Sequence, residues 1–136
     1  MGCDIHLHIE MKVNGKWLHY GCPAVDRDYA LFAKMANVRN YHNITPISEP
    51  RGFPCDGVSE LTAVCYTDEK PDAHDISWLN KEEIEQLTEW YNHRPKEKDV
   101  WRCWNHHGIK SYLCGNNITS EVKSIEDVRL VFWFDN

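Results

Sequence analysis

The sequence predicts an α+β fold in which a small antiparallel sheet, formed by an N-terminal hairpin and a C-terminal strand, packs with about three helices. Residues 3–13 and 16–20 alternate between apolar and polar side chains on either side of Asn14-Gly15, the favoured two-residue hairpin turn. Residues 127–135 alternate in the same way. Apolar residues at helical spacing lie between these strands. We expect residues 1–136 to form a single domain.

The helices are predicted from apolar spacing and from capping residues. Residues 27–38 follow a predicted N-cap, Asp26, and residues 81–93 follow Asn80 and carry acidic side chains in the first turn. A short helix is predicted over 59–66. The proline- and glycine-rich segment 39–57 also holds apolar side chains, so we expect an ordered, packed loop, and residues 67–75 are predicted to be a polar loop.

Composition and charge restrict the classes of function. The chain is 42% hydrophobic and 26% charged, which is typical of globular domains. No apolar run is long enough to span a bilayer, and the first residues do not resemble a signal peptide, so we expect a cytoplasmic protein whose six cysteines are free thiols or metal ligands. A net charge of −6 does not favour nucleic-acid binding driven by phosphate contacts.

The first strand carries the strongest functional signal. Side chains alternate across a sheet, so Asp4, His6, His8 and Glu10 share one face, and the hairpin register adds His19 to it. Two imidazoles in a His-x-His pair lie about 6–7 Å apart and can converge on one divalent ion. The alternative is an ordinary polar face exposed to solvent.

Three further segments contain candidate functional residues. Asp72 and His74 precede a helix and can add ligands to the first-strand cluster, or they belong only to a turn. Glu49 and Arg51 lie in the rigid loop, where they can contact a ligand, with Arg39 as a second cation, or form an internal ion pair. A structural zinc site could use residues of the tryptophan-rich segment, although buried free thiols are the better explanation there. Its candidate ligands are Cys103, His106 and Cys114, and a fourth ligand would have to come from Cys55 or Cys65.

Four segments also resemble a family of small uncharacterised proteins of tailed phages and prophages. The segments are 1–6 (MGCDIH), 28–40, 46–52 (PISEPRG) and 72–79. No activity is associated with this family, so the resemblance implies a phage-encoded protein of the host cytosol. It also indicates which polar positions belong to its motifs. These are Asp4, His6, Glu49, Arg51, Asp72 and His74.

We therefore expect a small metal-dependent hydrolase, a phosphoesterase acting on a nucleotide or a nucleic acid. Zinc or manganese would be held by residues from the first strand and from the segment before the third predicted helix. The predicted ligands are Asp4, His6, His8, Asp72 and His74. Glu49 or Glu10 would act as general base, and Arg51 would stabilise developing negative charge.

The alternative function is a non-catalytic accessory protein. It would bind a host protein or sequester a nucleotide signal, with Arg39 and Trp78 among its contact residues. A cluster of Asp and His side chains that meets in space would favour the hydrolase. The C-terminal strand is predicted at a sheet edge, where a helix or a second copy of the chain would cover Val131 and Trp133.

Overall fold

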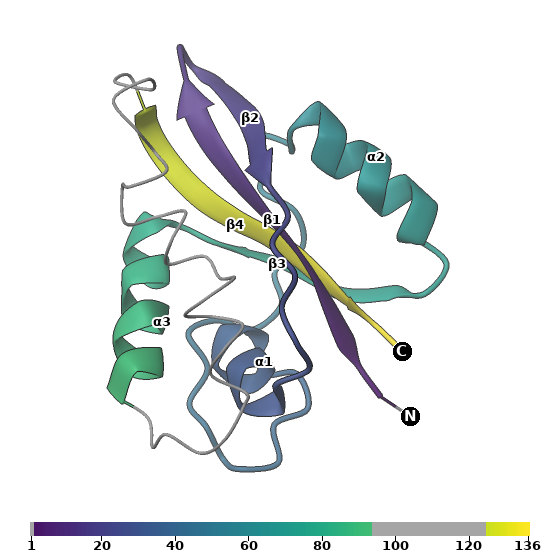
Figure 1. Cartoon of the computed structure of the whole chain (residues 1–136), viewed down its shortest axis with the longest axis vertical. Coiled ribbons are helices and arrows are strands. Elements are labelled where there is room, and N and C mark those ends of the chain that lie inside the picture. The colour runs from purple at the N-terminus through teal and green to yellow at the C-terminus, as the bar shows by residue number, and fades with distance from the viewer. Residues whose placement is uncertain (1, 94–124) are drawn as a thin grey trace.

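The computed structural model describes residues 2–93 and 125–136, and it confirms the α+β class. Four strands form one antiparallel sheet in the order β2-β1-β4-β3, with three helices beside it (Figure 1). The strands are β1 (Asp4–Val13), β2 (Lys16–Gly21), β3 (Ala73–Leu79) and β4 (Ile125–Asp135). The helices are α1 (Tyr29–Ala36), α2 (Glu60–Glu69) and α3 (Lys81–His93). No helix in the described ranges is both long and apolar enough to cross a membrane.

The N-terminal hairpin forms as its turn sequence predicts. Asn14 and Gly15 both have positive φ angles, 52° and 76°, as a type I′ turn requires. Glu10 faces His19 and Val13 faces Lys16, which confirms the predicted register near the turn. Farther from the turn, a β-bulge shifts the pairing between Ile9 and Glu10.

β4 lies inside the sheet, so its prediction as an edge strand is wrong. It pairs with β1 along its whole length and with β3 on its other side. Both edges of β4 are therefore occupied, and a second copy of the chain cannot pair with it. Among the described strands, β2 and β3 form the edges of the sheet.

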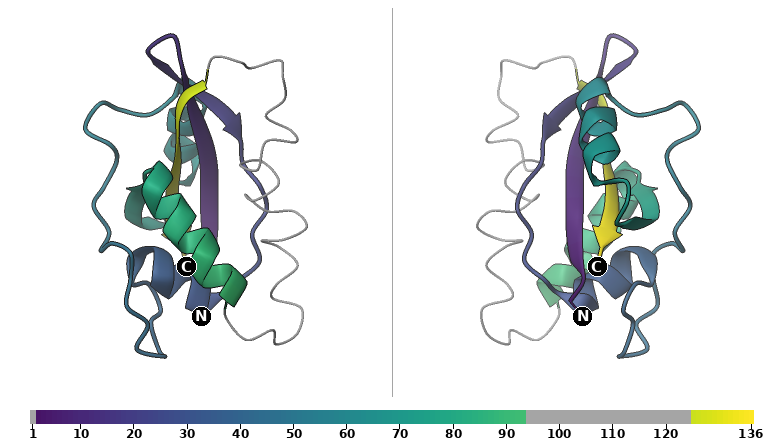
Figure 2. Two further views of the ribbon diagram at one scale, coloured as in Figure 1. Left: turned by 90° about the vertical axis from the view of Figure 1, so that its left-hand side faces the viewer. Right: turned by 90° about the vertical axis from the view of Figure 1, so that its right-hand side faces the viewer.

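Helices cover both faces of the sheet (Figure 2). α1 and α3 pack on the face that carries the main core, and α2 lies across the opposite face, hereafter the α2 face. The core strands contribute alternate residues, namely Ile5, Leu7, Ile9, Leu130, Phe132 and Phe134. On the α2 face, Trp133 is fully buried against Tyr66 of α2 and Phe53 of the preceding loop. Of the two predicted ways to cover Trp133, a helix or a second copy of the chain, the structure shows a helix of the same chain.

All three predicted helices form, and the start of α3 is fixed by its capping residues. Asn80 and Glu83 cap α3 reciprocally, each side chain accepting a hydrogen bond of 2.9 Å from the other's backbone N–H, and this helix has the predicted bounds. α1 is capped by Asp28, not Asp26. The predicted loop 67–75 is wrong, because α2 extends to Glu69 and β3 begins at Ala73.

Candidate metal-binding site

The sheet separates the predicted metal ligands between its two faces. His6, His8 and Glu10 are paired with Trp133, Val131 and Arg129 and lie on the α2 face. His74 is paired with Phe134, a core residue, and lies on the opposite face. His74 therefore does not converge with His6 or His8 on one ion.

The two remaining predicted ligands also lie outside a common site. Asp4 forms a two-point ion pair with Arg27, both contacts at 3.1 Å. This pair lowers the pKa of the Asp4 carboxyl below its usual value. Asp72 is exposed at the start of β3. His74 instead contacts Asp75 at 2.7 Å through Nδ1, while its Nε2 is buried with no hydrogen-bond partner among the described residues.

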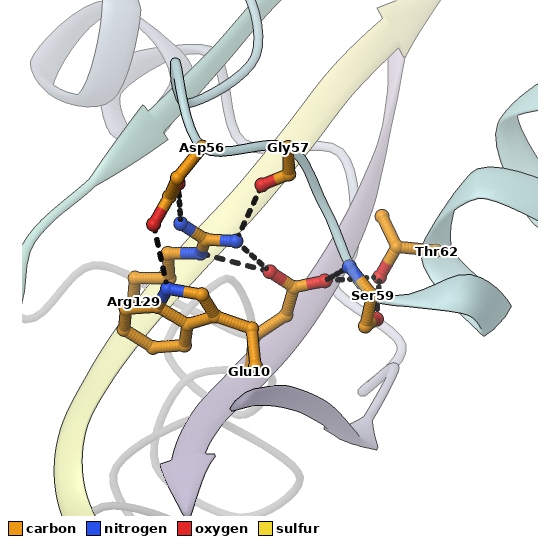
Figure 3. A network of polar contacts seen from close by, with 7 residues as sticks. Glu10, Asp56, Gly57, Ser59, Thr62 and Arg129 are labelled. Carbon is orange, nitrogen blue, oxygen red and sulfur yellow. Dashed lines mark hydrogen bonds and ion pairs between the residues drawn. The ribbon is translucent and has the colours of Figure 1, made fainter. Parts of the chain in front are cut away.

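Glu10 belongs to a buried ion-pair network and not to an open site (Figure 3). Its carboxylate is fully buried and accepts hydrogen bonds from Arg129 (2.8 Å), the backbone N–H of Ser59 (2.7 Å) and the Thr62 hydroxyl (2.8 Å). Burial alone raises the pKa of Glu10, but these hydrogen bonds outweigh it and leave the pKa below its usual value. All the contacts stabilise a carboxylate that fixes the start of α2 to the sheet, so Glu10 is poorly placed to act as a general base.

The predicted loop residues are bound to neighbouring parts of the chain. Glu49 accepts hydrogen bonds from the Asn37 amide at 3.0 and 3.3 Å. Arg51 donates to the backbone carbonyl of Trp78, forms an ion pair with Glu83 and stacks on the Trp78 ring. An internal ion pair was one of the two alternatives for Arg51, although its partner is Glu83 and not Glu49.

Arg39 likewise has neighbours within the chain. Its guanidinium lies 5.5 Å from the centre of the Tyr29 ring and donates to the Tyr41 hydroxyl at 3.5 Å. Arg51 and Trp78 lie at β3, and β4 separates that strand from β1. The structure therefore does not bring Arg51 or Trp78 to the histidines of β1.

A different group of side chains on the α2 face could hold a metal ion. His8, His19 and Cys22 each offer one ligand atom, and these three atoms lie within 4.8 Å of one another. His8 is almost fully buried, and its Nδ1 lies 3.0 Å from Nε2 of His19, so the two rings share one hydrogen bond. Imidazole nitrogen and thiolate sulfur are both zinc ligands, and a site with three protein ligands keeps one position open for substrate or water.

The β-bulge explains why Cys22 joins this group. The register near the turn, if continued, would place Cys22 opposite Leu7 on the core face. The shift places Gly21 opposite Ile9 instead, so the next residue, Cys22, comes opposite His8 on the α2 face. The positions of His8 and His19 on one face could be predicted from the sequence, but that of Cys22 could not, because nothing in the sequence around Tyr20 indicates the bulge.

Burial favours the neutral form of both histidines, the form in which a histidine binds a metal ion. Burial, and secondarily the charge of His19, lowers the pKa of His8 from 6.5 to about 4. Burial also lowers the pKa of His19. The His8 ring is stacked on Trp133 with 4.8 Å between the ring centres, which fixes its orientation.

His8 and Cys22 line a cavity of about 230 Å³ between β1, the segment after β2, and α2. We call it the His8 cavity. Its described lining consists of Ile5, His6, Leu7, His8, Cys22, Pro23, Ala24, Cys65 and Glu69. His6 is held between two carboxylates, with Nε2 2.5 Å from Asp135 and Nδ1 3.3 Å from Glu69. Cys65 and Glu69 were not predicted as site residues, because their proximity depends on how α2 lies on the sheet.

The low pKa of His8 predicts a specific dependence of stability on pH. In the unfolded chain His8 binds a proton below about pH 6.5, whereas in the folded protein it does so only near pH 4. The contribution of neutral His8 to the free energy of unfolding is therefore complete above about pH 6.5 and is lost as the pH falls toward 4. We expect the metal-free protein to lose about 2 kcal/mol between pH 7 and pH 5 through this group. Urea unfolding at the two pH values measures this loss. The loss should be clearly smaller in His8→Ala, and an equal loss would contradict the assignment.

Comparisons with protein-family models, curated proteins and solved structures give no match. The resemblance to a phage family therefore stays a prediction. The candidate zinc ligands from Cys103 to Cys114 lie outside the described residues. Within the described residues, the group formed by His8, His19 and Cys22 is where the structure brings metal-ligating side chains together.

Proposed function

We propose that the protein is a metal-dependent hydrolase that holds a divalent ion, with zinc preferred, at His8, His19 and Cys22. The observation that carries the proposal is the grouping of these three ligand atoms beside the His8 cavity, which His8 and Cys22 line and which has room for a small substrate. A closed structural site would need a fourth ligand. Within residues 2–93 and 125–136 the group has three ligands, which leaves one position open, as in catalytic zinc sites.

The donor set supports zinc over manganese, the other metal considered from the sequence. Manganese prefers oxygen ligands, whereas imidazole nitrogen and thiolate sulfur suit zinc. An ion in this position supplies Lewis acidity to a substrate carbonyl or phosphoryl oxygen. The chain supplies the cavity wall and the imidazole of His8, whose orientation is fixed by stacking on Trp133.

Removal of one ligand tests the site directly. We expect the wild-type protein to bind one zinc ion, and His8→Ala and Cys22→Ser to weaken binding at least about 100-fold, because each removes one of three ligands. Competition with a chromophoric chelator measures the affinity. The matched control is His93→Ala, which removes an exposed histidine on α3 that is not part of the metal-ligand group.

Unchanged zinc affinity in His8→Ala and Cys22→Ser would contradict the proposal. Zinc-dependent hydrolysis is then measured on a panel of carboxyl esters and phosphoesters with the same variants. Zinc binding without hydrolysis of any panel member would leave a metal-binding protein that is not a hydrolase of these substrates.

The second candidate function is binding of a host protein, and one observation favours it. Leu18, Leu61 and Val64 are each about half exposed, at 50%, 50% and 52%, and line a groove of about 690 Å³ between β2 and α2. Apolar side chains gathered in this way are typical of interaction surfaces. The His8→Ala variant separates the two functions, because it removes the metal site and leaves this groove intact.

A further inference from the structure

A second acidic residue remains beside the proposed metal site after Glu10 is excluded as a base. Glu69, the last residue of α2, lines the His8 cavity together with His8 and Cys22. We propose that Glu69 is the general base of this site and that the substrate is a small uncharged ester or amide. This inference rests on the proposed hydrolase function and adds the base and the substrate class to it.

The Glu69 carboxylate is held in place by two neighbours. Its Oε2 accepts a hydrogen bond of 2.7 Å from the indole N–H of Trp133, and Nδ1 of His6 lies 3.3 Å from the same oxygen. His6 is itself fixed by Asp135 through its other ring nitrogen. Both contacts involve Oε2, so with respect to the described residues Oε1 keeps its capacity to accept a proton.

Burial distinguishes Glu69 from the carboxylates that serve structure alone. The Glu69 side chain is 35% exposed, whereas that of Glu10 is fully buried and bound to Arg129, Ser59 and Thr62. A general base must reach a water molecule beside the substrate, and Glu69 at the cavity wall meets this requirement. Trp133 connects the two parts of the site, because it stacks on His8 and donates to Glu69.

The lining of the His8 cavity favours an uncharged substrate. No Arg or Lys belongs to its described lining, and Arg51, the predicted partner for a phosphate, is bound to Glu83 and Trp78. A phosphate would meet the negative charge of Glu69 without a cationic side chain to balance it. The apolar part of the wall on this face, formed by Pro23 and Ala24, suits a short aliphatic acyl group. A volume of about 230 Å³ corresponds to roughly eight water molecules, so the substrate is small.

The reaction is the addition of water to the carbonyl group. The water oxygen forms a bond to the carbonyl carbon, and one water proton passes to Glu69. The bond from carbon to the leaving oxygen or nitrogen then breaks, and Glu69 returns the proton to that atom. The products are a carboxylic acid and an alcohol or amine, and nothing is oxidised or reduced.

Glu69→Gln tests the base without removing the acceptor for the indole N–H of Trp133. The matched control is Asp68→Asn, which neutralises the exposed neighbouring residue on the same helix. We expect the zinc-dependent hydrolysis of p-nitrophenyl acetate to fall at least 100-fold in Glu69→Gln and to stay near wild type in Asp68→Asn. Zinc affinity and melting temperature should be unchanged in both variants. p-Nitrophenyl phosphate should be hydrolysed far more slowly than the acetate by the wild-type protein.

A binding measurement gives a readout that does not depend on turnover. Acetohydroxamic acid is a small uncharged molecule that loses a proton when it binds zinc as acetohydroxamate, and a nearby carboxylate accepts that proton. We expect Glu69→Gln to weaken its binding to the zinc-loaded protein at least tenfold, measured by calorimetry, with no change in Asp68→Asn.

Each outcome decides a different part of the argument. If Glu69→Gln keeps full hydrolysis and full acetohydroxamate affinity, Glu69 is not the base. If the phosphate is the better substrate, or the acetate is not hydrolysed in a zinc-dependent manner, the substrate class is wrong. If the wild-type protein binds no zinc, the proposed function itself fails, and the chelator assay shows this independently of Glu69.

Discussion

Replacement of Glu10 by Ala is expected to lower the free energy of unfolding by about 3–5 kcal/mol, because it leaves the charge of a buried arginine poorly compensated. Arg129 is only 3% exposed and, within the part of the chain that the structure describes, would keep Asp56 as its one anionic partner, whose side chain is half exposed. The backbone N–H of Ser59 and the Thr62 hydroxyl would also lose their acceptor. Urea unfolding at pH 7 measures the change.

Asp4→Ala provides the matched control, because it also breaks a carboxylate–arginine pair on β1. The Asp4–Arg27 pair is about half exposed and screened by water, so its loss should change stability little. Equal losses in Glu10→Ala and Asp4→Ala would show that burial does not determine the strength of the Glu10–Arg129 pair. The start of α2 should also become more accessible to proteolysis in Glu10→Ala alone, since Glu10 connects this helix to the sheet.

The parts of the fold that local chemistry determines could be predicted from the sequence. Asn14-Gly15 specifies the hairpin turn, and Asn80 with Glu83 specifies the start of α3. β3 could not be predicted in this way, because it contains the polar residues His74 and Asp75 near its start and its pairing is irregular around Asp75, which has a φ of 51°. Pairing with β4, some 60 positions away in the chain, holds this strand in the sheet.

The candidate site could be predicted only in part, because it depends on contacts between distant segments. Alternation along β1 placed His6 and His8 on one face. α2 covers part of that face, which leaves His8 and Glu10 buried. The sequence of α2 has no apolar stripe that would predict this contact, and Thr62 is the one buried residue of the helix. Cys22 required the β-bulge, and Glu69 required the position of α2.

Trp133→Ala is expected to lower the free energy of unfolding by about 3–5 kcal/mol, because the removal of a fully buried tryptophan leaves a large cavity. The ring contacts Tyr66, Phe53 and His8, so its loss would loosen α2, the preceding loop and the metal site together. We therefore expect zinc affinity to fall in this variant although no ligand is removed. Trp133→Phe keeps most of the packing and loses only the hydrogen bond to Glu69, so it should cost less than half as much and retain zinc affinity. If both variants lose the same stability, the hydrogen bond to Glu69, and not packing, is the main contribution of Trp133, and α2 is held on the sheet chiefly by polar contacts at its two ends.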